Sequence, residues 1–395
     1  MKKLITSVFA TSLFTSAFAL NVSEDMTIVN GKDTINFTAP NVTLTITGTF
    51  DKLWYSPRAN FGDDYVYTNG DKVTVNLEYG SSLVLDSTQG GLFAGDDVSK
   101  SAVDMHITGG GTISTTLSYI STKNSRGKLY LDAFTDFTSA TYEIGVTSQP
   151  TNLTLSHSLV VNKLALLNGS VLTMSSDDDS SADISVLGAS ATINGTFVQT
   201  AGKYEALNAT TVVTGTLDLA VSKGFVTHWL TIGNGSTIII RADNAIMQSE
   251  TDYRVFGMSK DAVSTLKLYA DQQFADLWFN NDNTTGTLNA YTNGNALTFT
   301  GINSTGTLNI FIEEDFSWEN DKIHFTNATV EKVVSILGTI TIGDTVIDKS
   351  FWDIVSDGNK GVYVNLTQVP EPAEWAMIFG VIALGFVAYR RAGKR

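Results

Sequence analysis

Four histidines are the side chains of this sequence best suited to proton transfer or metal ligation near neutral pH. None stands two or four residues from another, the spacings that place two imidazoles on one side of a strand or helix. A Ser-His-Asp triad assembles from distant positions and stays open, although no Gly-x-Ser-x-Gly elbow accompanies it. We interpret the four as structural or surface residues: His106, His157, His228 and His324.

Carboxylates gather in short runs, which could bind Ca²⁺ or supply the acid and base of a sugar-cleaving site. Such chemistry needs carboxylates that converge, whereas consecutive residues of a strand point to opposite faces. The run within SSDDDSSAD is interpreted as a solvated turn, with an adventitious Ca²⁺ site and a catalytic role as alternatives. The sequence therefore predicts a non-enzyme without catalytic residues, metal site or cofactor. The runs are Asp63-Asp64, Asp96-Asp97, Asp177–Asp179 and Glu313–Asp315.

Several aromatic side chains could form a platform on which sugar rings stack. In a chain rich in strands, the same residues also serve to fill or cap a core. We favour core packing or capping for these candidates, which are Trp54-Tyr55, Trp229, Trp278-Phe279 and Trp318.

The composition excludes several classes of function. The 395-residue chain has 25 Lys and Arg against 40 Asp and Glu, a net charge of −15, so nucleic-acid binding through clustered cations is not expected. There is no cysteine, which excludes disulfides, zinc-thiolate sites and thiol nucleophiles. Hydrophobic residues make up 43%, enough for a sizeable core. Charged residues make up only 16%, which leaves Ser, Thr, Asn and Gly to cover much of the surface.

The elements that must carry these side chains are short strands. Alternation of apolar and polar residues with period two runs through Val42–Ile46, Lys72–Tyr79 and Thr265–Tyr269. In the second of these segments the alternation predicts that Tyr79 shares the buried face of the valines. Gly, Asn, Asp and Ser clusters separate the strands as turns. Tyr363 and Val364 are predicted to form the last strand of a closing hairpin.

A weak repeat organises the strands. Glycines followed by Ser or Thr recur, and those at 195, 215 and 235 are 20 residues apart, as are those at 286 and 306. A period near 20 fits one coil of a parallel β-helix, with two or three strands and a turn at a fixed corner. We therefore predict an all-β body over residues 20–368, a β-helix or solenoid with short irregular coils. Sandwich domains are the alternative, because they use strands and turns of the same kind.

Residues 1–19 are predicted to form a signal peptide. Lys2 and Lys3 precede a short apolar stretch, and Ala17 and Ala19 fit the small-x-small rule for signal cleavage. The mature chain is then expected to begin at Leu20, outside the cytoplasm.

The C-terminal tail, residues 369–395, has a different character from the body. Residues 375–389 are apolar without interruption and would span roughly 22 Å as a helix, somewhat less than the bilayer core. Thinning of the membrane and snorkelling arginines can close that difference. We predict a short transmembrane helix with its aromatic ends at Trp375 and Tyr389. The basic end, residues 390–395, would stay cytoplasmic through Arg390, Arg391, Lys394 and Arg395.

Pro370-Glu371-Pro372, followed by a short apolar helix and a basic end, resembles the PEP-CTERM sorting signal of exported bacterial proteins. The resemblance covers about 25 residues and implies an exosortase-like membrane protease as partner. That enzyme would recognise the motif, remove the helix and release the body. The resemblance also implies an inner-membrane-tethered precursor that later reaches the cell surface or the extracellular space. A permanent single-span anchor is the alternative.

These features together predict a surface protein with a structural or adhesive role in a polysaccharide matrix. Extracellular polysaccharide and, at least transiently, the inner membrane are the further partners expected. Two alternatives remain from the sequence: a carbohydrate-active enzyme on a β-helix, such as a lyase or glycosidase, and a carbohydrate-binding protein.

Overall fold

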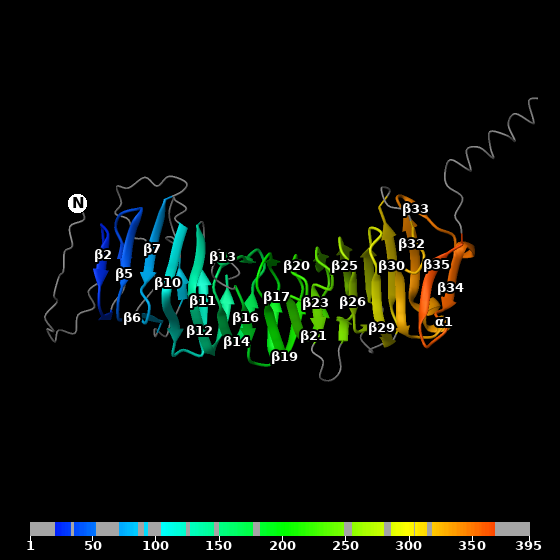
Figure 1. Ribbon diagram of the computed structural model, residues 1–395, viewed down its shortest axis with the longest axis horizontal. Helices are drawn as coiled ribbons and strands as arrows, with labels where there is room; N and C mark the ends of the chain where they lie inside the picture. Colours follow the sequence, from blue (N-terminus) through cyan, green and yellow to red (C-terminus); the bar gives the residue numbers. More distant parts are fainter. Residues whose placement is uncertain are drawn as a thin grey trace, which may run out of the picture.

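The fold of the chain is an elongated β-solenoid, seen here in a computed structural model (Figure 1). The structure describes residues 20–32, 35–52, 71–85, 91–93, 104–123, 127–145, 150–176, 182–248, 255–279, 286–303, 305–313 and 318–367. It has 63% strand and 4% helix. The predicted all-β fold and the predicted solenoid are confirmed, and the sandwich alternative is wrong.

Strands on three faces make up the solenoid, and each strand pairs in parallel with strands of the neighbouring coils. We name the faces first, second and third in the order in which the chain visits them. The first face contains β2 (Met26–Ile28), β5 (Val42–Ile46), β7 (Lys72–Leu77), the start of β10 (Asp104–Thr115), the start of β12 (Lys128–Ile144), β13 (Asn152–Leu155), β15 (Val171–Met174), β18 (Thr196–Gln199), β20 (Thr216–Leu219), β22 (Thr237–Ile240), β25 (Val263–Leu268), β28 (Thr287–Tyr291), β30 (Thr307–Ile312) and β32 (Leu337–Ile342).

The other two faces follow the same scheme. The second face contains β3 (Gly31–Lys32), β6 (Thr49–Lys52), β8 (Ser82–Leu85), the end of β10, the middle of β12, the start of β14 (Leu159–Leu166), β16 (Ile184–Val186), the start of β19 (Tyr204–Val213), the start of β21 (Phe225–Ile232), β23 (Ile246–Gln248), β26 (Gln272–Phe274), the start of β29 (Leu297–Asn303) and β31 (Ile323–Asn327). The third face contains β9 (Gly91–Phe93), β11 (Tyr119–Lys123), the ends of β12, β14, β19, β21 and β29, β17 (Ser190–Ile193), β24 (Val255–Met258) and β27 (Asp276–Phe279). At the N-terminal end β1 (Leu20–Val22) pairs with β4 (Ile35–Phe37).

A continuous apolar column fills the solenoid, because alternate residues of each strand point inward. In β7 the side chains of Val73, Val75 and Leu77 are buried, as their alternation predicts. Tyr79, expected on the same face, is 95% exposed, because β7 ends at Leu77 and the chain turns there. The prediction for Tyr79 is wrong for that reason.

Aromatic rings stack inside the column from coil to coil. On the second face Phe299 lies between Phe274 and Phe325, with ring centroids 5.5 and 5.6 Å apart. Earlier on the same face Tyr204 and Phe225 stack at 4.3 Å. Parallel in-register pairing places like side chains above one another, and stacked rings of this kind add to the free energy of burial.

The repeated glycines mark the corner between the third and first faces. Gly195 and Gly215 stand directly before β18 and β20, and the glycines at 235, 286 and 306 precede β22, β28 and β30. A Cβ atom at Gly215 would clash with the carbonyl oxygen of Gly195 on the coil before. The predicted fixed corner is confirmed at these positions. Gly48 and Gly111, which carry the same motif, lie instead between the first and second faces.

The second face is interrupted between β23 and β26, which share no backbone ladder in the described residues. The side chain of Gln272, 2% exposed, fills the break. The Ile246 N–H donates to Gln272 Oε1 (3.1 Å), and Gln272 Nε2 donates to the Ile246 carbonyl oxygen (3.0 Å). One buried amide thus satisfies both backbone groups of Ile246, which would otherwise be unpaired.

Antiparallel strands end the solenoid at its C-terminal side. After β31 come α1 (Val330–Ile336), β32 with β33 (Thr345–Val346), and the 3₁₀ turn η1 (Lys349–Phe351). β34 (Trp352–Ser356) and β35 (Val362–Leu366) then form a hairpin, and β35 also pairs antiparallel with β31. The predicted closing hairpin is confirmed, with Tyr363 and Val364 in β35.

Candidate functional site

The residues predicted to direct export lie outside the described part of the chain. The structure therefore does not test the signal peptide, the transmembrane helix or the sorting motif. These residues are Ala17 and Ala19 at the N-terminal end, and Pro370, Glu371, Pro372, Trp375, Tyr389, Arg390, Arg391, Lys394 and Arg395 at the C-terminal end.

The described residues contain neither a candidate membrane-spanning helix nor a candidate metal cluster. No helix there has the length and apolar character to cross a bilayer. No cluster of three or more His, Asp or Glu side chains there is arranged to hold a metal ion. Of the four acidic runs, only Glu313 falls within the described ranges.

The histidines lie apart from one another along the solenoid. His106 stacks on Tyr130 on the first face (centroids 4.2 Å apart), and burial, with a further effect of Lys72, lowers the pKa of His106. His157 Nδ1 accepts a hydrogen bond from the Ser158 backbone N–H. His228 is half-buried on β21. These placements agree with structural or surface roles.

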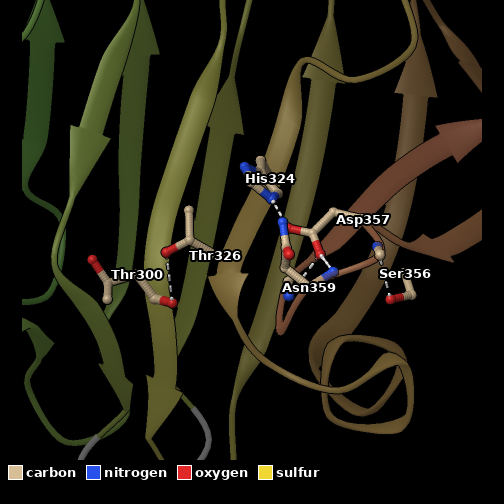
Figure 2. A network of polar contacts seen from close by, with 8 residues as sticks. Thr300, His324, Thr326, Ser356, Asp357 and Asn359 are labelled. Carbon is tan, nitrogen blue, oxygen red and sulfur yellow. Dashed lines mark hydrogen bonds and ion pairs between the residues drawn. The ribbon is translucent and has the colours of Figure 1, made fainter.

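His324 differs from the other histidines because it pairs with a carboxylate (Figure 2). His324 Nε2 lies 3.0 Å from Asp357 Oδ2, across 33 residues of sequence. Asp357 Oδ1 accepts hydrogen bonds from the backbone N–H groups of Asn359 (2.7 Å) and Gly361 (3.0 Å). The hydrogen bond from Asn359, with a smaller effect of His324, holds the pKa of Asp357 below its ordinary value. Tyr363 stacks on the His324 ring, with ring centroids 4.2 Å apart.

This His-Asp pair resembles two members of a catalytic triad, so the third member decides what the pair can do. A triad needs a nucleophilic hydroxyl that bonds to the second imidazole nitrogen. Among the described residues, Asp357 is the one hydrogen-bonding partner of the His324 ring. The nearby Ser356 hydroxyl accepts instead from the Gly358 backbone N–H. The arrangement fastens the closing hairpin to β31, and the sequence offered no signal for it.

The aromatic candidates separate into core and surface residues. Phe279 is fully buried, and Trp318 packs against the core. Trp229 and Trp278 are half-buried on the outside of the third face, with ring centroids 5.0 Å apart. Trp54 and Tyr55 lie outside the described residues. Core packing is thus confirmed for Phe279, whereas the tryptophan pair on the third face is a surface feature.

A second group of outward aromatics, which the sequence did not single out, lies on the first face. Lys267 of β25, Tyr291 of β28 and Phe311 of β30 follow one another in register on successive coils. The Tyr291 and Phe311 rings stack at 4.6 Å, and Lys267 Nζ lies 5.9 Å from the centre of the Tyr291 ring. Beside them Arg241 lies 5.3 Å from the centre of the Tyr269 ring. Arg241 and Tyr269 lie two residues further along the strands than the register position of Lys267, so they form a separate pair.

Comparison of the chain with protein-family models, with curated proteins and with solved structures finds no match. The fold defines the chain as a β-solenoid protein, and its function is argued from its own residues.

Proposed function

We propose that this chain is an exported cell-surface protein with a structural or adhesive role in a polysaccharide matrix. The observation that carries the proposal is an elongated solenoid body between two ends with the character of targeting signals. A solenoid of this kind is long, buries its backbone ladder and presents Thr and Asn side chains on its faces. Such a body suits a passive, load-resisting or adhesive role.

Sorting is the part of the proposal that explains the C-terminal tail. The apolar segment would hold the body at the outer side of the inner membrane, and the basic end would fix its topology. Pro370 and Pro372 would keep the intervening segment extended and open to an exosortase-like protease.

The mass of the C-terminal peptide, recovered from surface and membrane fractions of the native cell, tests this proposal. A peptide that ends near residues 370–374 is the expected result. Intact molecules that end at Arg395 and stay in the membrane fraction would mean a permanent anchor, and the matrix role would lose its main support.

Carbohydrate binding is the second candidate function, and the outward aromatics favour it. Half-buried rings on the outside of a solenoid offer flat apolar surfaces next to polar strand residues. Trp229 and Trp278 on the third face form such a surface. Binding of this kind is compatible with an adhesive role.

A further inference from the structure

The dipeptide Asn-Gly recurs in this chain, and it is a sequence in which the backbone can attack a side-chain amide. Because glycine has no Cβ, its backbone nitrogen can approach the amide carbon of the preceding asparagine. The new N–C bond closes a five-membered succinimide, and the amide nitrogen leaves as ammonia with the glycine N–H proton. Water then opens the ring to aspartate or isoaspartate. The six pairs are residues 30–31, 69–70, 168–169, 194–195, 234–235 and 293–294.

Three of these pairs occupy the same place in the fold, the corner between the third and first faces. They begin at Asn168, Asn194 and Asn234, directly before β15, β18 and β22. Each is followed by Ser or Thr, so the local sequence predicts similar reactivity for all three. A difference between them has to come from contacts with neighbouring coils.

The pair at Asn234 is held on both sides of the reaction by the next coil. The Gly235 N–H, whose nitrogen would attack, donates to the Val263 carbonyl oxygen (2.9 Å). The amide that would be attacked accepts the Val263 N–H at Asn234 Oδ1 (3.0 Å). Both bonds have to open before the two groups can meet.

The pair at Asn194 is held in the same way. The Gly195 N–H donates to the Leu166 carbonyl oxygen of the preceding coil (3.2 Å). Asn194 Oδ1 accepts a hydrogen bond from the Thr214 hydroxyl of the following coil (2.5 Å). Gly195 is also buried, whereas Gly235 is exposed.

Two more described pairs are restrained by other means. Asn30 Oδ1 accepts from the Thr49 backbone N–H (2.7 Å), which fixes its amide on the next coil. Asn293 is 4% exposed, so its amide is shielded from the water that the second step needs. Residues 69–70 lie outside the described part of the chain.

The pair at Asn168 lacks these restraints. Both Asn168 and Gly169 are exposed. Among the described residues, no hydrogen bond holds the Asn168 amide or the Gly169 N–H. The turn is closed by the Ser170 N–H, which donates to the Leu167 carbonyl oxygen (3.0 Å). The peptide between Asn168 and Gly169 can therefore rotate at a lower cost than its counterparts at the same corner.

We propose that Asn168 is a site of spontaneous deamidation in the folded protein and that the other described Asn-Gly pairs are protected. Isoaspartate at this position adds one carbon atom to the backbone between β14 and β15, together with a negative charge. Ser170 follows directly, and its Oγ accepts the Thr151 N–H (3.0 Å), so the longer turn disturbs the start of the first face in this coil. The inference goes beyond the proposed function and does not rest on it.

Incubation of the full-length chain in mildly alkaline buffer, followed by trypsin digestion and mass spectrometry, tests the inference. The tryptic peptide 164–203 contains both Asn168 and Asn194, and the peptide 224–241 contains Asn234. Fragment ions assign the mass increase of amide-to-acid conversion to one residue. We expect Asn168 to react about tenfold faster than Asn194 or Asn234, because the hydrogen bonds of the latter two have to open first.

Two controls show whether the fold sets the difference. In denaturant the three asparagines should react at similar rates, because their local sequences are alike. Asn168→Gln should abolish the early mass increase of peptide 164–203, because glutamine would have to close a six-membered ring, which forms more slowly.

Two results would overturn the inference. One is an equal rate at Asn168 and at Asn194 or Asn234 in the folded chain. The other is an unchanged Asn168 in the folded chain after a time in which the denatured chain has reacted. Neither result depends on whether the C-terminal tail is cleaved, so the sorting proposal stands or falls separately.

Discussion

Replacement of Gln272 by leucine is expected to destabilise the coil in which the second face is interrupted. Leucine keeps most of the side-chain volume and removes the amide that pairs with Ile246. The N–H and the carbonyl of a buried residue would then lack partners. Each unpaired group costs about 1–3 kcal/mol, partly offset by the gain from burying an apolar side chain. We expect a net loss of about 2–4 kcal/mol, by the same principle.

Hydrogen exchange at the Ile246 amide measures this effect where it arises. A solenoid can open locally, so the midpoint of thermal unfolding of the whole chain would underestimate the loss of stability in this coil. In Gln272→Leu the Ile246 amide should exchange about 30-fold or more faster, which is the factor for 2 kcal/mol. Thermal unfolding followed by circular dichroism should begin at a lower temperature.

Gln273→Leu is the control for this prediction. Gln273 is the neighbouring residue and has the same side chain, but it is exposed. Its replacement should leave the exchange of Ile246 unchanged. If the Ile246 amide exchanges as slowly in Gln272→Leu as in the unchanged chain, the Gln272 side chain does not stabilise the interrupted face, and the reasoning is refuted.

Two more predictions concern the corner glycines and the closing hairpin. Gly215→Ala should lower the melting temperature, because the new methyl group meets the Gly195 carbonyl oxygen. Gly110→Ala is the control, because a methyl group there has ordinary contact distances and should be tolerated. Equal melting temperatures of the two variants would contradict the close packing of the corner. Asp357→Asn should loosen the closing hairpin at neutral pH. Because folding lowers the pKa of Asp357, the carboxylate stabilises the hairpin above its ordinary pKa of 3.8, and this stabilisation is lost as the pH falls through the folded-state value. Hairpin exchange in Asp357→Asn and in the unchanged chain should therefore converge at low pH, and a difference that persists there would assign the effect to another cause.

The sequence predicted the solenoid because two local signals agree along most of the body. Alternation identifies the inward residues of strands such as β7, and the corner glycines repeat because a Cβ does not fit where coils approach closely. Tyr79 shows the limit of alternation, which does not locate the residue at which a strand ends. The three faces could not be assigned from sequence, because the turns between strands differ in length from coil to coil.

The surface features were harder to predict than the core. Lys267 and Tyr291 are 24 residues apart in sequence, and Tyr291 and Phe311 are 20 apart, so neighbours across coils follow no fixed spacing. His324 and Asp357 meet only because β35 turns back beside β31. Trp229 and Trp278 were named as candidates from their residue type alone. The predicted export signals rest on the local order of residues, and the described structure does not test them.

The position of β35 has a mechanical consequence. It is the last strand before residue 368, so a pull on the C-terminal end of the chain reaches it before any other strand. β35 lies between β31 and β34 and is paired to both, so it cannot be peeled from a free edge. Both ladders and the contact between His324 and Asp357 resist together. A body tethered by its C-terminus would thus meet tension first at a strand that is paired on both sides and not at a free sheet edge.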